Sequence, residues 1–341
     1  GVGIRPRGER MNADGGVAGR RLELVSVVDD GGDVAVALDA ARQFVEQDDV
    51  FAVVLASAAP EPELTDYLAG QFVPFFGWGF APGFCDPNQW GFGFNGCLLG
   101  VPGADPDVST RELTTDFFDR PATVVLITTA DAAGNAVAAQ AGDVWGENLL
   151  EVIQLEATSG GDFTAVRDIL AANAPDIALL AVGLDLTIAL KADLIGRFEG
   201  MVLDDVSYLP GLLGDFVTSD KLQGGYSVTQ FPPQEEYREV TAIVATDLER
   251  VGGDLVYSRA VSIGYWSTDL LGAILAAVGP DLDTASFYEA ANVDGVDYNP
   301  GFVGAPCPMN TLDIHGSPAG GAALVRVDGG VYRPVVAFGC Y

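Results

Sequence analysis

A short loop of small residues, Ser57-Ala58-Ala59, is placed to bind an anion through its backbone. It follows the apolar run 51–55 and precedes Pro60, whose fixed φ and missing N–H suit the first turn of a helix. Uncovered N–H groups at the start of a helix attract carboxylates and phosphates. We therefore predict that Ser57 and Ala58 contact a ligand.

A second loop, Trp78-Gly79-Phe80, follows the apolar run 73–76. Neither this run nor 51–55 alternates with polar residues, which is typical of strands covered on both faces of a parallel sheet. The carboxyl ends of such strands share one edge, where open α/β folds bind ligands. We predict that Trp78, Gly79 and Phe80 also contact the ligand; the alternative is that the two aromatic rings only pack in a core or between lobes.

Catalytic chemistry is poorly supported by the sequence. His315 is the only histidine, and its turn, 313–317, lies in a stretch with Gly316, Ser317 and Pro318, which predicts a surface loop rather than a base beside a nucleophile. No G-x-S-x-G elbow, Walker loop or G-x-G-x-x-G follows a predicted strand. We predict a protein that is not an enzyme, with a hydrolase as the less favoured alternative, and we expect no cofactor and no metal.

The composition restricts the partners. The 341 residues carry a formal net charge of −31, and Lys191 and Lys221 are the only lysines. Such a surface repels nucleic acid and anionic lipid, so we expect neither as a partner. No unbroken apolar run reaches the roughly 18 residues that a membrane helix needs. The sequence shows no leader, and we expect that one has been removed.

Four cysteines suggest an oxidising compartment. Cys85 and Cys97 bracket an aromatic, Gly-rich loop, and Cys307 and Cys340 bracket the C-terminal segment; no C-x-x-C spacing occurs. Of the three possible pairings, 85–97 with 307–340 closes local loops and is the one we favour, with four buried free thiols as the alternative. Disulfides of this kind indicate an extracytoplasmic protein.

The pattern of apolar residues predicts two α/β lobes. Crossings between the lobes are expected near 120, 231 and 302, so lobe 1 is 1–119 with 232–301 and lobe 2 is 120–231 with 302–341. Such a three-crossing hinge suits closure around a ligand. In lobe 1 we predict strands over 22–28, 51–55 and 73–76, and a long loop over 81–103. We predict helices over 1–14, 33–47, 107–119, 234–250, 258–278 and 284–291, and a further helix that begins near Pro60 and carries Leu64, Tyr67 and Leu68. In lobe 2 we predict helices over 134–143, 163–172 and 185–196. We predict strands over 123–128, 149–155, 176–182, 201–203, 225–229, 322–327 and 331–337, the last two joined as a hairpin.

These features resemble the type I periplasmic binding fold of branched-chain amino-acid (Leu/Ile/Val) substrate-binding proteins. The resemblance covers nearly the whole chain from Asn12. It is carried by the run 12–25 with Asp29-Asp30, by 50–54, by Val73-Pro-Phe, by 161–166, by Ala174-Pro-Asp-Ile and by Tyr265-Trp266. The family starts with a central strand ahead of its first helix, and none precedes Gly1 here, so we expect a trimmed chain or a first lobe built differently.

The resemblance implies a small-molecule ligand, an amino acid or a related amphipathic solute, held between two lobes without chemistry. In the family, the first-lobe loops hold the ligand carboxylate, and a second-lobe acid pairs with its ammonium. Asp205 lies at the matching position here. A carboxylate buried on closure needs a cation, so Asp205 favours an amine. Asp204 is the rival residue, and a solvated Asp-Asp turn is the alternative to both.

Other site positions depart from the family. Its D-x-x-Y-G motif corresponds to Asp131, Ala133 and Gly134, and Gly183-Leu184 replaces another common Tyr. Loss of two rings would widen the pocket and make it more apolar, so we predict a ligand bulkier or less polar than valine. Two further aromatic residues are candidates for the cleft or the hinge, Tyr208 and Tyr265, although aromatic residues in helices more often belong to the core.

The resemblance also implies partners and a location. A solute-binding protein of this type delivers its ligand to an ABC permease, is extracytoplasmic, periplasmic or a cell-surface lipoprotein, and is expected to be monomeric. The alternative is a ligand-sensing extracellular domain of a receptor. No helix-turn-helix segment precedes the fold, which counts against a DNA-bound regulator.

Overall fold

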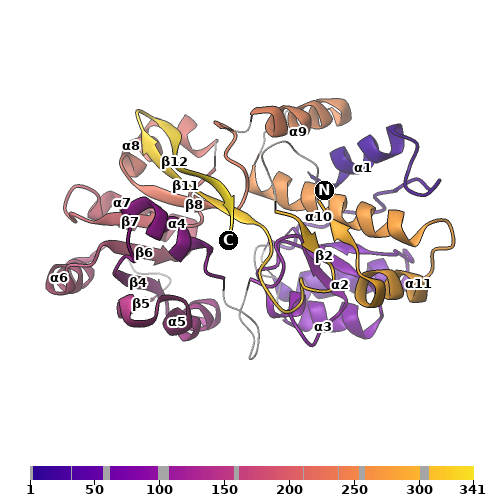
Figure 1. The fold of residues 1–341 in the computed structure, drawn as a ribbon, viewed down its shortest axis with the longest axis horizontal. Coiled ribbons are helices and arrows are strands. Elements are labelled where there is room, and N and C mark those ends of the chain that lie inside the picture. Colours follow the sequence, from indigo (N-terminus) through magenta and orange to yellow (C-terminus); the bar gives the residue numbers. More distant parts are fainter. Residues whose placement is uncertain are drawn as a thin grey trace. The chain divides into compact units, whose positions relative to one another are not determined.

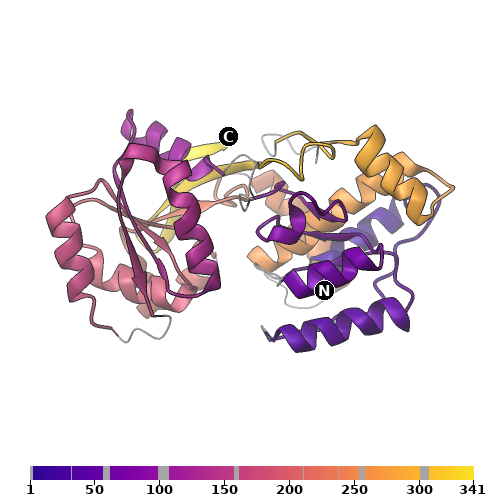
Figure 2. The same cartoon turned by 90° about the horizontal axis from the view of Figure 1, so that it is seen from below.

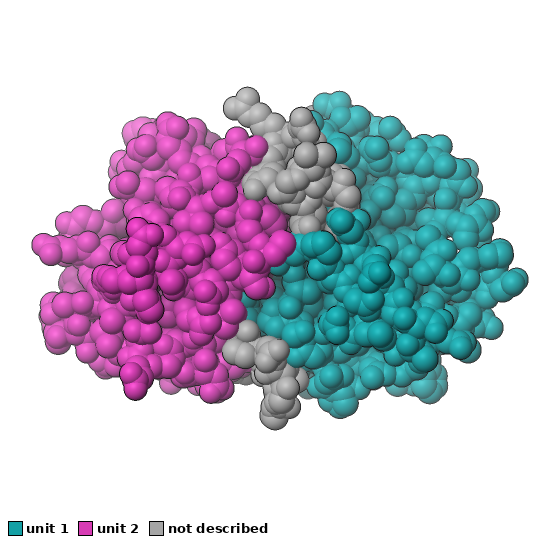
Figure 3. All heavy atoms as spheres, viewed as in Figure 1, with its two compact units in different colours: residues 1–107, 239–320 teal, residues 108–238, 321–341 magenta. Residues whose placement is uncertain are grey.

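The computed structural model describes residues 3–31, 33–56, 62–98, 107–156, 161–209, 211–236, 238–252, 258–299 and 307–341. The chain divides into two compact units, shown in different colours in Figure 3. Unit 1 comprises residues 1–107 and 239–320, and unit 2 comprises 108–238 and 321–341. The chain therefore passes between the units three times. The predicted class of two discontinuous α/β lobes is confirmed.

The passages between units differ in position from the predicted boundaries at 120, 232 and 302. The helix Ser109–Phe118 packs on the C-terminal hairpin of unit 2, so it belongs to that unit. Residues 315–318 belong to unit 1, because Asp86 donates its N–H to the carbonyl of His315 and Cys97 donates to that of Ser317. Helix packing sets the first of these boundaries and backbone pairing the last, and neither leaves a mark on hydrophobic periodicity.

Unit 2 alternates strands and helices along most of its length (Figure 1). Its elements are α4 (Ser109–Phe118), β4 (Val124–Thr129), α5 (Ala132–Trp145), β5 (Leu149–Leu155), α6 (Thr164–Asn173), β6 (Ile177–Ala181), α7 (Leu184–Leu194), β7 (Met201–Asp204), α8 (Phe216–Leu222), β8 (Tyr226–Thr229), β11 (Gly321–Asp328) and β12 (Val331–Cys340). The strand order is β12-β11-β8-β7-β6-β4-β5. From β8 to β5 neighbouring strands are parallel, whereas β11 is antiparallel to both neighbours.

Helices cover both faces of the parallel strands of unit 2 (Figure 2). Val125 and Ile127 of β4 pack in a cluster with residues of α6 and α7. Val124 instead packs with Leu113 of α4 and Trp145 of α5. All six residues of β4 are buried, which explains why this strand shows an unbroken apolar run in the sequence.

A buried ion pair joins α7 to the end of β7 in unit 2. Lys191 and Asp204 are both fully buried, and their side chains form a salt bridge. Lys191 Nζ also donates to Ser207 Oγ at 3.1 Å and to the carbonyl of Tyr226 at 2.7 Å. The Asp204 carboxylate accepts from the N–H groups of Val206 and Ser207 at 2.8 and 2.6 Å. These bonds compensate for the removal of both charges from water.

Unit 1 has a smaller sheet and several crossing helices. Its elements are α1 (Ile4–Ala13), α2 (Val34–Glu46), β1 (Val53–Val54), α3 (Pro62–Gly70), β2 (Phe75–Gly77), β3 (Gly91–Gly93), α9 (Arg238–Val251), α10 (Arg259–Val278), α11 (Thr284–Glu289), β9 (Asp297–Tyr298) and β10 (Met309–Asn310). Strands β1, β2 and β3 form a parallel sheet in that order, and β9 pairs with β10. Strand β3 lies within the region predicted as a long loop.

The predicted strand over 22–28 is wrong: these residues adopt no regular secondary structure. Their apolar side chains are unusually open, with Val25 53% and Val27 54% exposed. Strand β1 is an edge strand of its sheet and pairs with β2 alone among the described residues. The segment 22–28 has the composition of a strand, but a cavity of about 890 Å³ separates it from the open edge of β1, so no ladder forms.

Helix α10 is the central helix of unit 1. It is long and apolar enough, by length and composition alone, to cross a membrane, a possibility that the sequence did not suggest. Of its most apolar 18-residue window, 72% is buried inside the protein, and α10 packs against α1 and β2. This burial is typical of the core helix of a globular unit.

Candidate functional site

Three predicted site residues of unit 2 follow neighbouring parallel strands. Asp131 comes two residues after β4, Gly183 two residues after β6, and Asp205 directly after β7. Strand β6 pairs in parallel with both β4 and β7, so the three carboxyl ends lie side by side. The structure thus gathers these residues at the edge where a doubly wound sheet binds ligands.

Two helices begin at this edge. The Asp131 carboxylate accepts a hydrogen bond from the N–H of Gly134 at 2.8 Å and caps α5. Gly183 is the N-cap of α7, where it supplies no side chain, and Leu184 is the first helical residue and is half-buried. Ala133 lies in the first turn of α5; its side chain falls outside the described part of the chain. Helix N-termini favour negative or polar groups of a solute.

The structure separates the two neighbouring aspartates after β7. Asp204 is fully buried and engaged by Lys191, Ser207 and the following backbone. Asp205 is exposed at the surface of unit 2. Asp204 therefore has a structural role in the core, whereas Asp205 lies exposed directly after the end of β7.

Tyr208 is held by polar contacts within unit 2. Its hydroxyl donates to Glu235 Oε2 at 2.7 Å and accepts from the N–H of Gln234 at 2.9 Å. Its ring packs edge-on against Tyr332 at a centroid distance of 4.8 Å. Only 7% of Tyr208 is exposed, so its position beyond β7 is fixed by its neighbours.

In unit 1, the predicted loop after β2 lies at the carboxyl end of the parallel sheet. Trp78 is buried, Phe80 is half-buried, and their ring centroids lie 5.9 Å apart. Gly79 has a φ of +102°, and a Cβ there would lie 2.1 Å from a backbone oxygen, so only glycine fits. Ser57 and Ala58, in the other predicted loop, lie outside the described residues.

Arg259 is a residue of this edge that the sequence analysis missed. It is the first residue of α10, and its guanidinium carbon lies 3.9 Å from the centroid of the Trp78 ring. The preceding residue, Ser258, caps the helix by accepting from the N–H of Val261. Helix periodicity cannot reveal such a contact, because the two residues are 181 positions apart in the printed sequence.

Tyr265 lies in a buried polar network of unit 1 and not in a loop at the sheet edge. Its hydroxyl donates to Asp247 Oδ2 at 2.8 Å, and the Arg7 guanidinium lies 5.8 Å from its ring centroid. Arg7 also pairs with Asp269, 2.5 Å away. Burial, followed by the bond to Asp247, raises the pKa of Tyr265 far above its usual value, so the phenol stays protonated.

The predicted disulfide between Cys85 and Cys97 is confirmed. Cys307 and Cys340 are also disulfide-bonded, and no described cysteine is a free thiol. The Cys85–Cys97 bridge closes a loop whose backbone supports the end of β2. Leu98, directly after that loop, donates its N–H to the carbonyl of Gly79 at 3.0 Å.

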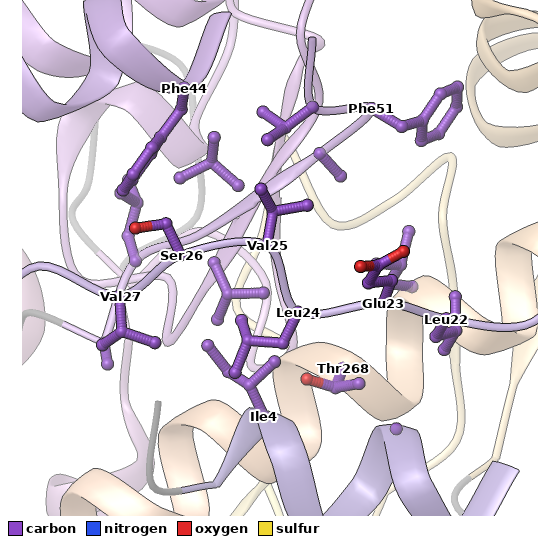
Figure 4. Close-up of a pocket in the computed structure, with 18 of the residues that line it drawn as sticks. Ile4, Leu22, Glu23, Leu24, Val25, Ser26, Val27, Phe44, Phe51 and Thr268 are labelled. Carbon is purple, nitrogen blue, oxygen red and sulfur yellow. The ribbon is translucent and has the colours of Figure 1, made fainter. Parts of the chain in front are cut away.

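A cavity of about 890 Å³ lies beside β1 in unit 1. We call it the β1 groove, and it lies between the segment 22–28 and the edge of β1. Figure 4 shows Val25 and Val27 projecting from this segment, with Ile4 and Thr268 on one side and Phe44 on the other. The N–H groups of Val53 and Leu55 point away from the groove, to β2. The groove thus flanks the sheet, whereas the predicted site residues lie at its carboxyl end.

His315 is buried in unit 1, which corrects the prediction of a surface loop. It is 4% exposed, its Nε2 lies 3.0 Å from Asn292 Oδ1, and its ring contacts that of Phe92 at a centroid distance of 5.3 Å. Desolvation lowers the pKa of His315, opposed by the charge of Asp86. The burial arises because the turn packs against the Cys85–Cys97 loop.

The buried imidazole predicts a pH-dependent stability. A histidine whose pKa is lowered on folding stabilises the native state above its unfolded pKa of about 6.5, and that contribution is lost as the pH falls further. Between pH 7 and 5, the native protein is expected to lose up to about 1.4 kcal/mol per pH unit more than a His315→Gln variant. Urea unfolding at both pH values measures this difference; equal slopes would show that protonation of His315 is not linked to folding.

Comparison with known proteins gives a consistent result for the fold. The family described as periplasmic binding protein matches residues 2–331. No curated protein sequence matches the chain. Among solved structures, a solute-binding protein of an ABC transporter from R. palustris in complex with 4-hydroxybenzoate has a TM-score of 0.73 at 11% identity, covering 99% of this chain and 91% of that one.

Two further structures are similar over the whole chain. The branched-chain amino acid transporter substrate-binding protein LivJ from Streptococcus pneumoniae, in complex with isoleucine, has a TM-score of 0.70 at 15% identity and covers 100% of this chain and 93% of that one. An ABC transporter substrate-binding protein from Sphaerobacter thermophilus has a TM-score of 0.73 at 16% identity, covering 98% and 92%. At these identities the likeness establishes the fold.

Proposed function

Because this chain belongs to the periplasmic binding protein family, we propose that it is the extracytoplasmic solute-binding component of an ABC importer. Members of this family bind solutes and are not enzymes. The bound form would be the one that a membrane permease recognises. Differential affinity for that form would drive the conformational change.

The observation that carries the proposal is the grouping of Asp131, Gly183 and Asp205 at one edge of the unit 2 sheet. The exposed Asp205 carboxylate and two helix N-termini lie at this edge, and among the described residues there no nucleophile contacts a base. This arrangement can orient a small polar solute. Asp131, Ala133, Gly183, Leu184, Asp205 and Tyr208 are the proposed contacts from unit 2.

Unit 1 supplies the second set of proposed contacts. Trp78, Gly79 and Phe80 follow β2 at the carboxyl end of the parallel sheet. Ser57 and Ala58, which come after β1 in the sequence and lie outside the described residues, remain proposed contacts. Tyr265 is buried among charged side chains of the core, so we propose for it a supporting role only. The aromatic rings of this set favour a solute with an apolar or aromatic body.

We propose that the solute is an amino acid or an aromatic acid bulkier than valine. Similar structures hold benzoate, 4-hydroxybenzoate and isoleucine, which share a carboxylate on an apolar body. A thermal-shift screen tests this class, because a ligand that binds only the native state raises the melting temperature. At a ligand concentration of a hundredfold Kd, such binding adds about 2.7 kcal/mol to the free energy of unfolding. A protein that no carboxylic acid stabilises, or that converts one into a product, would contradict the proposal.

An Asp205→Asn variant is expected to distinguish the two kinds of acid. If Asp205 pairs with the solute ammonium in a desolvated site, its loss weakens binding of isoleucine by about 2 kcal/mol or more, close to thirtyfold. Benzoate carries no ammonium, so its affinity would not fall. Calorimetric titration of both solutes gives the comparison directly.

Asp143→Asn is a matched control for this experiment. Asp143 is an exposed carboxylate in the C-terminal half of α5, far along the chain from the cap at Asp131. The Asp143→Asn substitution removes one negative charge from unit 2, as Asp205→Asn does, but leaves the sheet edge unchanged. Isoleucine binding should therefore equal that of the wild type. Equal affinities of the Asp205→Asn variant and the wild type for every amine-bearing solute would exclude Asp205 from the site.

A further inference from the structure

We propose that a cavity of unit 1 lined by Arg5, Arg21 and Arg250 is a binding site for a phosphate group. The site goes beyond the proposed solute binding and does not depend on it, because none of the described residues proposed as solute contacts lines this cavity. It is drawn from unit 1 alone. Three observations carry it: the convergence of cations without carboxylate partners, the contacts that hold their segments together, and the charge of the cavity.

The three arginines come from three separate segments of the chain. Arg5 lies in the first turn of α1, Arg250 in the last turn of α9, and Arg21 in the irregular segment between α1 and α2. All three residues are exposed, so an anion can reach their guanidinium groups from solvent. The cavity has a volume of about 420 Å³, and its other lining residues are Glu9, Asn12, Ala13 and Val251.

These arginines are unusual in this chain because they lack a carboxylate partner. The sequence has 48 acidic and 17 basic residues, and most other described arginines contact a carboxylate or an aromatic ring. Among the described residues, Arg5, Arg21 and Arg250 form no ion pair and lie over no ring. Like charges around one cavity repel one another, so an anion bound between them is stabilised.

Hydrogen bonds hold the three segments together. Asn12 binds both backbone groups of Leu22: its Nδ2 donates to the carbonyl and its Oδ1 accepts from the N–H, each at 2.8 Å. This pair fixes the preceding residue, Arg21, beside α1. Arg10 of α1 donates to the buried Asp247 of α9 at 3.1 Å. Because α1 is joined to both other segments, the cations are close together before an anion arrives, which lowers the entropic cost of binding.

The charge of the cavity favours a phosphate group. Three guanidinium groups and the carboxylate of Glu9 leave a net charge of about +2. A phosphate monoester carries about −1.5 to −2 charges at pH 7, whereas a carboxylate carries one. The planar fork of arginine also matches the oxygens of phosphate. The chain as a whole has a net charge of −31 and repels nucleic acid, so the ligand is a single phosphate group and not a polyanion.

Calorimetric titration with inorganic phosphate and with glycerol phosphate tests the site, with acetate at the same ionic strength as the comparison. We expect the wild type to bind phosphate at one site per chain and more tightly than acetate. Arg21→Gln and Arg250→Gln should each weaken phosphate binding by about tenfold, since each removes charge-assisted hydrogen bonds. Glu9→Gln should strengthen it, because the carboxylate that repels the anion is removed.

Arg20→Gln is the matched control. Arg20 is exposed and adjacent to Arg21, but its guanidinium lies 3.4 Å from the carbonyl oxygen of Gly279, and it does not line this cavity. The substitution removes the same charge as Arg21→Gln, yet phosphate affinity should equal that of the wild type. Melting temperatures confirm that each variant is folded.

Vesicles separate the two sources of a phosphate group. Co-sedimentation with phosphatidylcholine vesicles that contain phosphatidic acid, lost in Arg21→Gln, would assign the site to a lipid headgroup. Binding of the free phosphates alone would assign it to a soluble ligand, and either result supports the site. The inference is overturned if neither the free phosphates nor the vesicles bind, if acetate binds as tightly as phosphate, or if Arg20→Gln weakens binding as much as Arg21→Gln. The proposed solute binding is unaffected by these outcomes.

Discussion

Replacing Lys191 by methionine is expected to lower the free energy of unfolding by about 3–5 kcal/mol. The Lys191 ammonium and the Asp204 carboxylate are both fully buried, and the ammonium donates to Ser207 and to the carbonyl of Tyr226. Methionine fills a similar volume but leaves Asp204 as a buried charge without its cation. The cost is the desolvation of that charge, which the remaining hydrogen bonds do not offset.

Urea unfolding of three variants tests this account. Lys191→Met alone should show the large loss, whereas Lys191→Met combined with Asp204→Leu should recover part of it, because no charge is then buried. Arg197→Met is the control: Arg197 pairs with Asp193 on the surface and is 64% exposed, so its loss should cost under about 1 kcal/mol. A loss under 1 kcal/mol for Lys191→Met would show that the pair is not essential to the native state.

Removal of the Cys85–Cys97 disulfide is expected to cost about 3 kcal/mol. The bond closes a loop of sequence separation 12, and both cysteines are fully buried. A double Cys85→Ala, Cys97→Ala variant avoids placing hydroxyl groups in the core. Without the cross-link the unfolded chain gains conformational freedom, which stabilises the unfolded state relative to the native one.

Two readouts separate this effect from a packing defect. Urea unfolding of the disulfide variant should give a lower midpoint together with a larger m value, because the unfolded chain exposes more surface without the bond. Solute binding should also weaken, since Leu98, next to Cys97, donates its N–H to the carbonyl of Gly79 in the loop after β2. A lower midpoint with an unchanged m value would assign the loss to packing, and an unchanged midpoint would refute the prediction.

The sequence predicted the architecture of unit 2 well, for a physical reason. Strands such as β4 are buried on both faces, so their residues form unbroken apolar runs. In the helices between them, apolar residues recur about every 3.6 positions. In unit 1 the same rules failed for the segment 22–28, where strand-forming residues lie apart from any neighbouring strand. Composition describes what a segment can form, but pairing depends on what lies beside it.

The candidate site was predictable only in part. Position after a strand correctly located Asp131, Gly183 and Asp205 at one edge of the sheet. The burial of Asp204 against Lys191, 13 positions earlier in the sequence, is a product of tertiary packing that the sequence pattern does not reveal. Asp205 remains a proposed contact. Arg259 was missed for the same reason: its contact with Trp78 is a product of tertiary packing.

The β1 groove gives the acidity of the chain a physical meaning. Within the part of the chain that the structure describes, β1 presents an edge without a second strand, and apolar side chains such as Val25 and Val27 are open beside it. Edges of this kind pair readily with other copies of a protein. A net charge of −31 makes copies repel one another, which keeps such a protein in solution. The excess of acidic residues thus acts against self-association, and it carries no information about the solute.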